Sequence, residues 1–237
     1  MNGFMIGFGA IPGFQTGFFL PSEGADWTGL VLLCLAAAVF SYLCGSINSA
    51  VLVSRGLFGE DIRSFGSGNA GLTNMHRVFG VKGAALTLVG DMLKAVVAIL
   101  GSMALVGYLY GGNLALLFCV VGHAFPCFFN FRGGKGVLSA ATGICCLSPV
   151  VFLVLISLFL LMVISTKFVS VGSITAAFFY PLMLSAFFGA VPFFMLSTAL
   201  LTAVLVIFLH RENVRRLIHG EEKKFGQKEP PKDGEEK

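Results

Sequence analysis

The sequence predicts an all-α integral membrane protein with seven transmembrane helices, one of which is short or broken. Two observations concern composition: 56% of the 237 residues are hydrophobic and 12% are charged, and the mean hydropathy is +0.88. A soluble domain carries about 25% charged residues. The third observation is that basic residues gather between apolar segments, at 55–82, 132–135, 167 and from 211 onward. These features exclude a disordered chain, a disulfide scaffold and a water-soluble enzyme of ordinary design.

The first residues, 1–26, are rich in Phe and Gly and lack the basic n-region of a secretory signal peptide. We expect them to form an interfacial or poorly ordered leader. A membrane domain over residues 27–220 follows it. Residues 221–237 are expected to form a charged cytoplasmic tail that is solvated and mostly disordered.

The membrane domain is defined by apolar runs, since a spanning helix needs about 20 such residues. They cover 27–53, 84–110, 114–131, 136–164, 168–188 and 192–209. The run 136–164 is too long for one span and contains Pro149. If it crosses twice, with a turn at Ser148 and Pro149, all four basic clusters lie on one face, as short cytoplasmic loops do.

This choice gives seven spans, an external N-terminus and a cytoplasmic C-terminus. It has a structural cost, because residues 136–147 make a helix only ~18 Å long. Protein rather than lipid must therefore shield part of that segment.

Charge and cysteine content exclude several kinds of partner. The net charge of +4 is modest and indicates no nucleic-acid binding. The six cysteines lie in apolar runs without metal-ligand spacing to His, so we expect no metal, no cofactor and no disulfide framework. The sequence has no internal repeat that would favour an inverted-repeat transporter.

The first of three polar, glycine-rich segments covers residues 61–77. Gly66, Gly68 and Gly71 match G-x-G-x-x-G, but no predicted strand precedes them, so we reject a dinucleotide-binding fold. Glycines nevertheless let backbone N–H groups approach an anion. The uncharged donors here are Ser67, Asn69, Thr73 and Asn74, and the cations are Arg63 and Arg77. The alternative interpretation is a turn with helix caps.

The second segment covers residues 122–136, where Gly133, Gly134 and Gly136 surround Lys135. The spacing is not that of a Walker A motif, but a Lys between glycines suits a phosphate as a point charge. The alternative is a loop that only carries positive charge to the cytoplasm. His123 lies in an apolar run, and it is either a functional residue or a core His bonded to a backbone carbonyl.

The third segment, residues 210–216, follows the last apolar run. On a helix, His210 and Asn213 would share one face and point together toward a site. The alternative is a juxtamembrane basic stop signal. Asp91 and Lys94, three apart in an apolar run, are predicted first as a structural ion pair and second as part of the site.

Several catalytic motifs are missing, including G-x-S-x-G, H-E-x-x-H and the His-x-x-x-x-Asp signature of common glycerolipid acyltransferases. What remains is a cytoplasmic-face pocket, rich in anion donors, that opens onto lipid. Such a pocket favours a phosphorylated substrate with an apolar tail.

Five motifs in order carry a resemblance to a known family. They are Gly-Ser-Ile-Asn-Ser at 45–49, the glycine-rich run 66–74, Gly-His-Ala-Phe-Pro at 122–126 with Arg-Gly-Gly-Lys-Gly at 132–136, residues 167–173, and His-Arg-Glu-Asn at 210–213. With these the chain resembles the bacterial acyl-phosphate:glycerol-3-phosphate acyltransferases, the PlsY-type membrane enzymes. Leu72, Arg132 and the pair Leu138 and Ser139 depart from the family's usual residues, and the leader is longer than usual.

The resemblance implies acyl transfer from acyl phosphate to the 1-hydroxyl of sn-glycerol 3-phosphate, giving lysophosphatidic acid and phosphate. It implies no metal and no acyl-enzyme, with substrate phosphate helping to take the proton. The implied catalytic residues are Ser67, Arg77, Lys135, His210 and Asn213. The implied substrate-binding residues are Gly66, Gly68, Asn69, Gly71, Thr73, Asn74, Gly133, Gly134 and Gly136, with Ser46 and His123 in support.

The implied location is the bacterial cytoplasmic membrane, with membrane lipid as surroundings and the site on the cytoplasmic face. Two other classes compete with the enzyme. One is a membrane anion or phosphate transporter, and the other is a non-catalytic lipid-binding scaffold.

Overall fold

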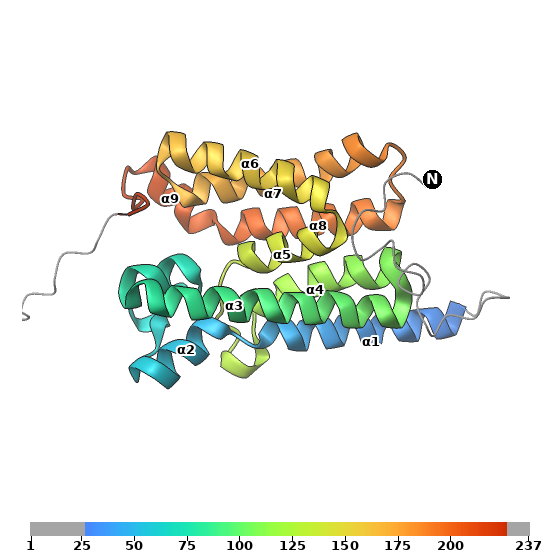
Figure 1. The fold of residues 1–237 in the computed structure, drawn as a ribbon, viewed down its shortest axis with the longest axis horizontal. Coiled ribbons are helices and arrows are strands. Elements are labelled where there is room, and N and C mark those ends of the chain that lie inside the picture. Colours follow the sequence, from blue (N-terminus) through green and yellow to red (C-terminus); the bar gives the residue numbers. More distant parts are fainter. Residues whose placement is uncertain (1–26, 227–237) are drawn as a thin grey trace, which may run out of the picture.

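The computed structural model describes residues 27–226, and all regular elements in that range are helical (Figure 1). The leader 1–26 and the tail from 227 onward lie outside the described residues. The longer helices are α1 (Trp27–Ser46), α3 (Leu72–Gly107), α4 (Asn113–Ala124), α5 (Val137–Leu147), α6 (Pro149–Thr166), α7 (Val169–Phe188) and α8 (Phe193–Leu209). The shorter elements are α2 (Ser49–Phe58), α9 (Arg211–Ile218) and the turns η2 (Ile62–Ser64), η3 (Tyr108–Gly112) and η4 (Cys127–Phe129).

The helices run along a common direction and form two groups. Figure 1 shows α1 to α4 on one side and α6 to α9 on the other, with the short helix α5 between them. The main apolar core lies where α3, α4 and α5 meet, and includes Ile99, Met103, Leu116 and Ile144. The α5 segment is thus packed against protein, as its length demands.

The predicted turn between α5 and α6 is confirmed. Ser148 is the N-cap of α6, where its Oγ accepts a hydrogen bond of 3.4 Å from the N–H of Val151, and Pro149 occupies the first turn. A Ser cap followed by Pro is a strong helix start, since Pro needs no N–H partner there. The chain between Gly136 and Thr166 therefore makes two helices.

Four helical stretches of the described residues are long and apolar enough to cross a membrane: Trp27–Phe58, Leu72–Phe129, Pro149–Thr166 and Val169–Phe188. The bent pair α8 and α9 brings the number to five. The stretch Leu72–Phe129 itself folds back at η3, after Gly107 with φ 82°, so that α4 returns beside α3 (Figure 1). The protein is accordingly an all-helical, multi-pass membrane protein.

Two helix boundaries differ from the predicted runs. The first run is divided at Ile47 and Asn48, because Asn48 Oδ1 accepts the N–H of Val51 at 3.0 Å and starts α2 as a separate helix. The second run begins earlier, at Leu72, and is kinked at Gly80. Apolar patterning does not report a polar helix start such as 72–79, nor a cap made by one buried amide.

Glycines allow α1 and α4 to lie in close contact. A Cβ atom at Gly45 would collide with the carbonyl of Cys119, and one at Gly122 would collide with the carbonyl of Tyr42. This approach brings the end of α4 against the junction of α1 and α2, where the polar loops begin.

We expect Gly122→Ala to destabilise the protein by about 1–3 kcal/mol, because the added methyl group overpacks the crossing of α1 and α4. The matched control is Gly56→Ala in α2, where nothing lies within 4 Å of the added Cβ. Melting temperatures in detergent measure both variants. Equal melting temperatures would show that the crossing is not tightly packed.

Candidate active site

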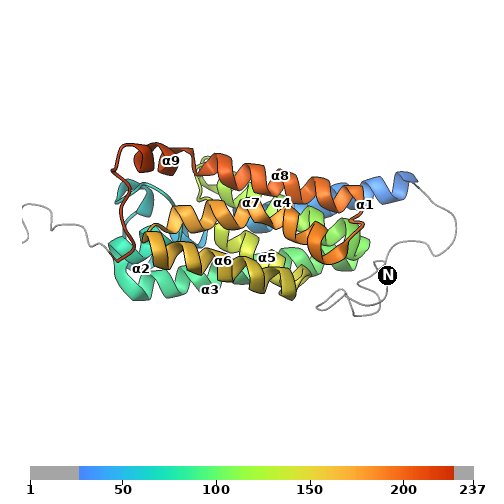
Figure 2. The same ribbon diagram turned by 90° about the horizontal axis from the view of Figure 1, so that it is seen from above.

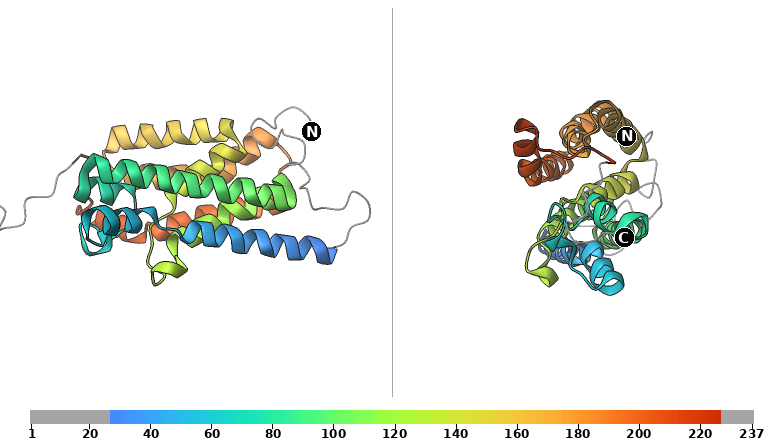
Figure 3. Two further views of the ribbon diagram at one scale, coloured as in Figure 1. Left: turned by 60° about the horizontal axis from the view of Figure 1, so that its bottom comes forward. Right: turned by 90° about the vertical axis from the view of Figure 1, so that its left-hand side faces the viewer.

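The polar loops lie together at one end of the helix bundle. Figure 2 shows α2, the start of α3 and α9 at the same end, opposite the start of α1. The loop that contains η4 projects beside the junction of α1 and α2 (Figure 3). Its position is held by Ser46, whose buried Oγ accepts the N–H of Cys127 at 3.4 Å. Ser46 therefore occupies a supporting position.

Asn74 shapes the first glycine loop from inside. Its Oδ1 accepts the N–H of Ser67 at 3.0 Å, and its Nδ2 donates to the carbonyl of Phe65 at 3.0 Å. A side chain at Gly66, which has φ 59°, would collide with this Oδ1, so only glycine fits there. The amide of Asn74 thus faces the loop rather than a ligand, unlike its expected role. Ser67 and Thr73 are exposed, and Asn69 is half-buried beside Gly71.

The second glycine loop is docked on the end of α4. The N–H of Gly133 donates to the carbonyl of Ala124, and the N–H of Gly134 donates to the carbonyl of His123, each at 3.1 Å. A Cβ at Gly134 would collide with His123 Nε2 and lie 2.6 Å from the carbonyl of Ala70. The two glycine loops therefore touch at Gly134.

The loop then places Lys135 beside the start of α5. Gly136, with φ 70°, is the N-cap of that helix. The first N–H groups of a helix have no partner within it and attract anions.

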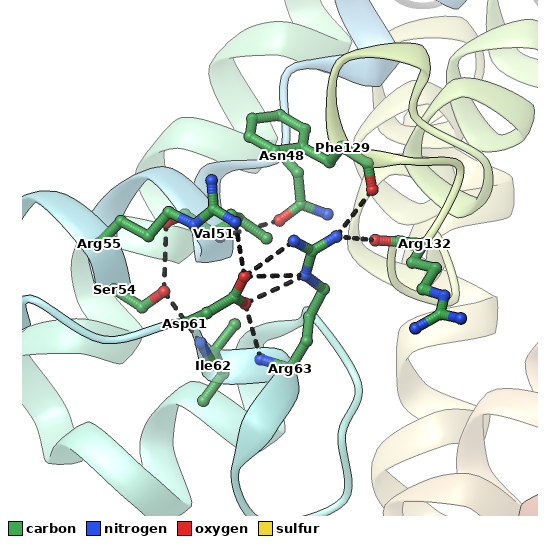
Figure 4. Close-up of polar contacts among 9 residues, drawn as sticks. All are labelled: Asn48, Val51, Ser54, Arg55, Asp61, Ile62, Arg63, Phe129 and Arg132. Atoms are coloured by element: carbon green, nitrogen blue, oxygen red, sulfur yellow. Dashed lines mark hydrogen bonds and ion pairs between the residues drawn. The ribbon is translucent and has the colours of Figure 1, made fainter.

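Arg63 connects these two loops, as Figure 4 shows. Its guanidinium pairs with Asp61 at 2.8 Å and also donates to the carbonyls of Phe129 at 2.7 Å and Arg132 at 3.1 Å. Hydrogen bonds from Arg63, and secondarily from Arg55, hold the pKa of Asp61 well below its usual range. The expectation that Arg63 adds charge for an anion does not hold, because its donors are bound to protein.

The third segment is helical from Arg211 onward, and His210 lies at the bend that precedes this helix. His210 has φ −93° and ψ 6°, which ends α8, and α9 begins at Arg211 after a bend of 48°. The His210 Nδ1–H donates to the carbonyl of Val206 at 2.7 Å and holds the ring in place. His210 and Asn213 are nevertheless both buried at this bend. His210 also interacts electrostatically with Lys135.

The second and third segments meet at Lys135. Its Nζ donates to Asn213 Oδ1, and the Nδ2 of Asn213 donates to Glu222 Oε1 at 2.6 Å. Glu222 also accepts from Ser170 Oγ at 2.8 Å and from Arg216 Nε at 2.8 Å. Residues more than seventy positions apart in the chain thus form one hydrogen-bonded group.

Among the described residues of the tail, 221–226, Glu222 departs from the expectation of a solvated tail. Its side chain is only 9% exposed, and the N–H of Phe225 donates to the carbonyl of Lys167 at 2.7 Å, which fixes the tail nearby. Glu222, Arg216 and Ser170 were missed as site residues. In the sequence, Glu222 belongs to a run of charged residues in which no local pattern distinguishes it from its neighbours.

The charged side chains of this group act on one another's pKa values. Burial, followed by the charge of Arg216 and then that of Arg77, lowers the pKa of Lys135 to about 8, although Glu222 opposes the change. For Glu222, burial is outweighed by hydrogen bonds from Asn213, Arg216 and Ser170, so its pKa is lowered. Three cations and one carboxylate leave a net positive charge where Arg77 and Lys135 were expected to act. Within residues 27–226, no cluster of three His, Cys, Asp or Glu residues could hold a metal ion.

Comparison with known proteins decides the class of this site. A family profile described as "Glycerol-3-phosphate acyltransferase" matches residues 35–220. The chain belongs to the glycerol-3-phosphate acyltransferase family. It is therefore a membrane acyltransferase of the bacterial type.

Individual relatives agree with this assignment. The acyltransferase is 39% identical to "Glycerol-3-phosphate acyltransferase" of Thermoanaerobacter sp. over 197 residues, covering 83% of this chain and 98% of the relative. It is 40% identical to the protein of the same name from Clostridioides difficile, covering 81% and 95%.

Two crystal structures of PlsY, an integral membrane glycerol 3-phosphate acyltransferase, are similar in fold. The glycerol 3-phosphate form has a TM-score of 0.70 at 36% identity, covering 81% of this chain and 96% of that one. The lysophosphatidic acid form has a TM-score of 0.69 at 33% identity, covering 81% and 95%.

The pKa of Lys135 predicts how the acyltransferase responds to pH. The side chain is a cation below about pH 8 and loses its charge above it, so kcat/KM should fall up to tenfold per pH unit on the alkaline side. In Lys135→Arg the charge persists far above this range, so residual activity should show no such fall. An identical fall of kcat/KM at alkaline pH in the wild type and in Lys135→Arg would show that the fall does not come from Lys135.

The tail can be divided into a required part and a dispensable part. A chain that ends after Gly226 keeps Glu222 and Phe225, and we expect near-normal activity and melting temperature. A chain that ends after Gly220 lacks Glu222, so the Nε–H of Arg216 and the Nδ2–H of Asn213 lose their acceptor. We expect the loss of the charged hydrogen bond to lower the free energy of unfolding by about 1.5–3 kcal/mol. Activity and detergent melting temperature should both fall; two equally active truncations would refute a role for Glu222.

Proposed function

We propose that this acyltransferase transfers an acyl chain from acyl phosphate to the 1-hydroxyl of sn-glycerol 3-phosphate, giving lysophosphatidic acid and inorganic phosphate. The observation that carries the proposal is the contact of Lys135 with Asn213, close to Arg77 and Arg216. It joins the second and third polar segments at the end of an apolar helix bundle, and the charge of Arg77 from the first segment also acts on Lys135. Related structures in glycerol 3-phosphate and lysophosphatidic acid forms support this substrate and this product.

Each residue has a role in the proposal. Lys135 and Arg77, joined by Arg216, neutralise phosphate charge. The side chains of Ser67, Asn69 and Thr73 donate to phosphate, and His210 and Asn213 orient glycerol 3-phosphate toward the acyl carbon. The remaining residues shape and support the two loops; they are Gly66, Gly68, Gly71, Asn74, Gly133, Gly134, Gly136, Ser46 and His123.

The reaction needs positioning and charge stabilisation more than a dedicated base. The 1-hydroxyl oxygen bonds to the acyl carbonyl carbon, while the bond from that carbon to the phosphate oxygen breaks. Phosphate leaves with the bonding electron pair, and a phosphate oxygen takes the hydroxyl proton. Acyl phosphate is an activated mixed anhydride, so holding the two reactants together beside fixed cations supplies the main acceleration.

The same proposal includes the topology. Seven spans would cross the bacterial cytoplasmic membrane, with the N-terminus outside and the C-terminus and the site on the cytoplasmic face. It is supported by Arg55, Arg77, Lys167 and Arg211, which lie on elements at the same end of the bundle (Figure 2). In this arrangement α1, α3, α4, α5, α6, α7 and α8 are the seven spans.

The test is an assay of the purified full chain with acyl phosphate and glycerol 3-phosphate, beside a parallel assay with acyl-CoA. Lys135→Ala should lower turnover by about 10²–10³-fold, because it removes a cation aimed at phosphate. Lys82→Ala, which removes an exposed lysine of the first basic cluster, is the control and should leave turnover unchanged.

Three outcomes would overturn the proposal. The first is equal use of acyl-CoA as donor. The second is normal turnover in Lys135→Ala. The third is passage of labelled phosphate into sealed vesicles without formation of lysophosphatidic acid, which would indicate a transporter.

A further inference from the structure

A buried ion pair in α3 lies outside the group of residues assigned to chemistry. Asp91 Oδ1 and Lys94 Nζ are 2.8 Å apart, and both side chains are almost fully buried. The sequence prediction of an ion pair is thus confirmed. Charges are costly in the interior of a membrane protein, and where they occur they are paired and often serve function. The contacts of Lys94 show what this pair does.

Lys94 lies within α3, and its side chain reaches the break between α1 and α2. Its Nζ donates to the carbonyl of Ile47 at 2.8 Å, at the break between α1 and α2. In a continuous helix this carbonyl would accept the N–H of Val51, but that N–H bonds to Asn48 Oδ1. Lys94 therefore supplies the donor that the break removes, and its position is fixed by the main chain.

The third contact of Lys94 sets the state of His123. Lys94 Nζ lies 2.8 Å from His123 Nδ1, and an ammonium can only donate. Nδ1 must therefore accept, which places the ring proton on Nε2. Asp91 Oδ1 is 3.8 Å from Nδ1 and balances the charge of Lys94. The ring is thereby held neutral, in one tautomer and one orientation.

The far edge of this ring supports the loop of Lys135. His123 Nε2 lies directly against Gly134, where no Cβ could fit, and the His123 carbonyl accepts the Gly134 N–H at 3.1 Å. Lys135 is the next residue, and it reaches Asn213. A continuous set of contacts therefore connects Lys94, His123, Gly134 and Lys135.

We propose that Lys94, held by Asp91, is a positioning residue that acts through His123 to set the place of the Gly133–Lys135 loop. Neither Lys94 nor Asp91 touches substrate. An apolar pair of similar volume could fill the same space and give comparable stability, but it could not fix the direction of the imidazole ring. The inference rests on the proposed function in one respect, namely that Lys135 binds a substrate phosphate.

The first experiment removes both charges together. The double variant Asp91→Asn, Lys94→Met leaves no unpaired charge in the core, so the protein can fold. We expect the KM for the substrate whose phosphate Lys135 binds to rise by about ten- to hundredfold, with a smaller change in kcat, since the loop is displaced. Both substrates are titrated, because either phosphate can be the one that Lys135 holds.

The matched control is Ser41→Ala with Ser102→Ala, which removes a different buried polar pair, one that joins α1 to α3. These hydroxyls are 2.8 Å apart and contact no residue of the site loops. The control should keep the KM of the wild type. An equal rise in KM in both double variants would overturn the proposal, because it would show a general effect of packing.

His123→Asn separates positioning from stability. The Asn Oδ1 atom can accept from Lys94 in place of Nδ1, but the shorter side chain no longer reaches Gly134. We expect a melting temperature near that of the wild type and a KM that rises as in the double variant. Wild-type KM in either His123→Asn or the double variant would refute the positioning role.

A binding measurement keeps this inference separate from the proposed reaction. Inorganic phosphate should raise the detergent melting temperature of the wild type, and this rise should shrink in the double variant but not in the Ser41, Ser102 control. If the wild type shows the phosphate effect but no acyl transfer, the reaction is wrong and the positioning role stands. If the phosphate effect is the same in all three proteins, the positioning role fails.

Discussion

A chain in a membrane must satisfy its polar backbone groups from within, and this constraint shapes three interruptions of the helices near the site. The break after α1 is capped by Asn48 and by Lys94, which reaches the carbonyl of Ile47. The start of α6 is capped by Ser148. The end of α4 is bonded by the amides of Gly133 and Gly134. These three breaks are thus closed by specific partners, and Lys94 and the two glycine amides come from distant parts of the chain.

The hydrogen bonds that complete these helix ends also assemble the proposed site. Because the second glycine loop completes the hydrogen bonds of α4, its position is tied to the helix bundle, and Lys135 is presented from a rigid base. The first glycine loop is closed internally by Asn74 and linked to the second by Arg63. Positioning of this kind suits a reaction between an activated acyl donor and an alcohol, where geometry and charge are the main requirements.

The positive charge at the site is only partly balanced by negative charge. Glu222 balances part of the positive charge of Lys135, Arg77 and Arg216. It also holds the Asn213 side chain in place by accepting a hydrogen bond from its Nδ2. The remaining net positive charge suits a phosphate, and burial lowers the pKa of Lys135 to about 8, close to neutral pH. The pair Asp91 and Lys94 differs, since it is neutral overall and fully enclosed, in keeping with a role in position rather than in binding.

The sequence by itself determined the class of protein, most helix positions, the turn at Ser148, the ion pair in α3 and the polar segments that lie at one end of the bundle. These follow from apolar run length, turn residues and spacing within one helix, which are local properties of the chain. Only the tertiary structure decided that Asn74 binds its own loop, that Arg63 links the two glycine loops, that α8 ends at His210 and that Glu222 enters the hydrogen-bonded group at Lys135. Those outcomes depend on partners such as Lys135 and Asn213, separated by 78 positions, and no local pattern encodes which distant donor meets which acceptor.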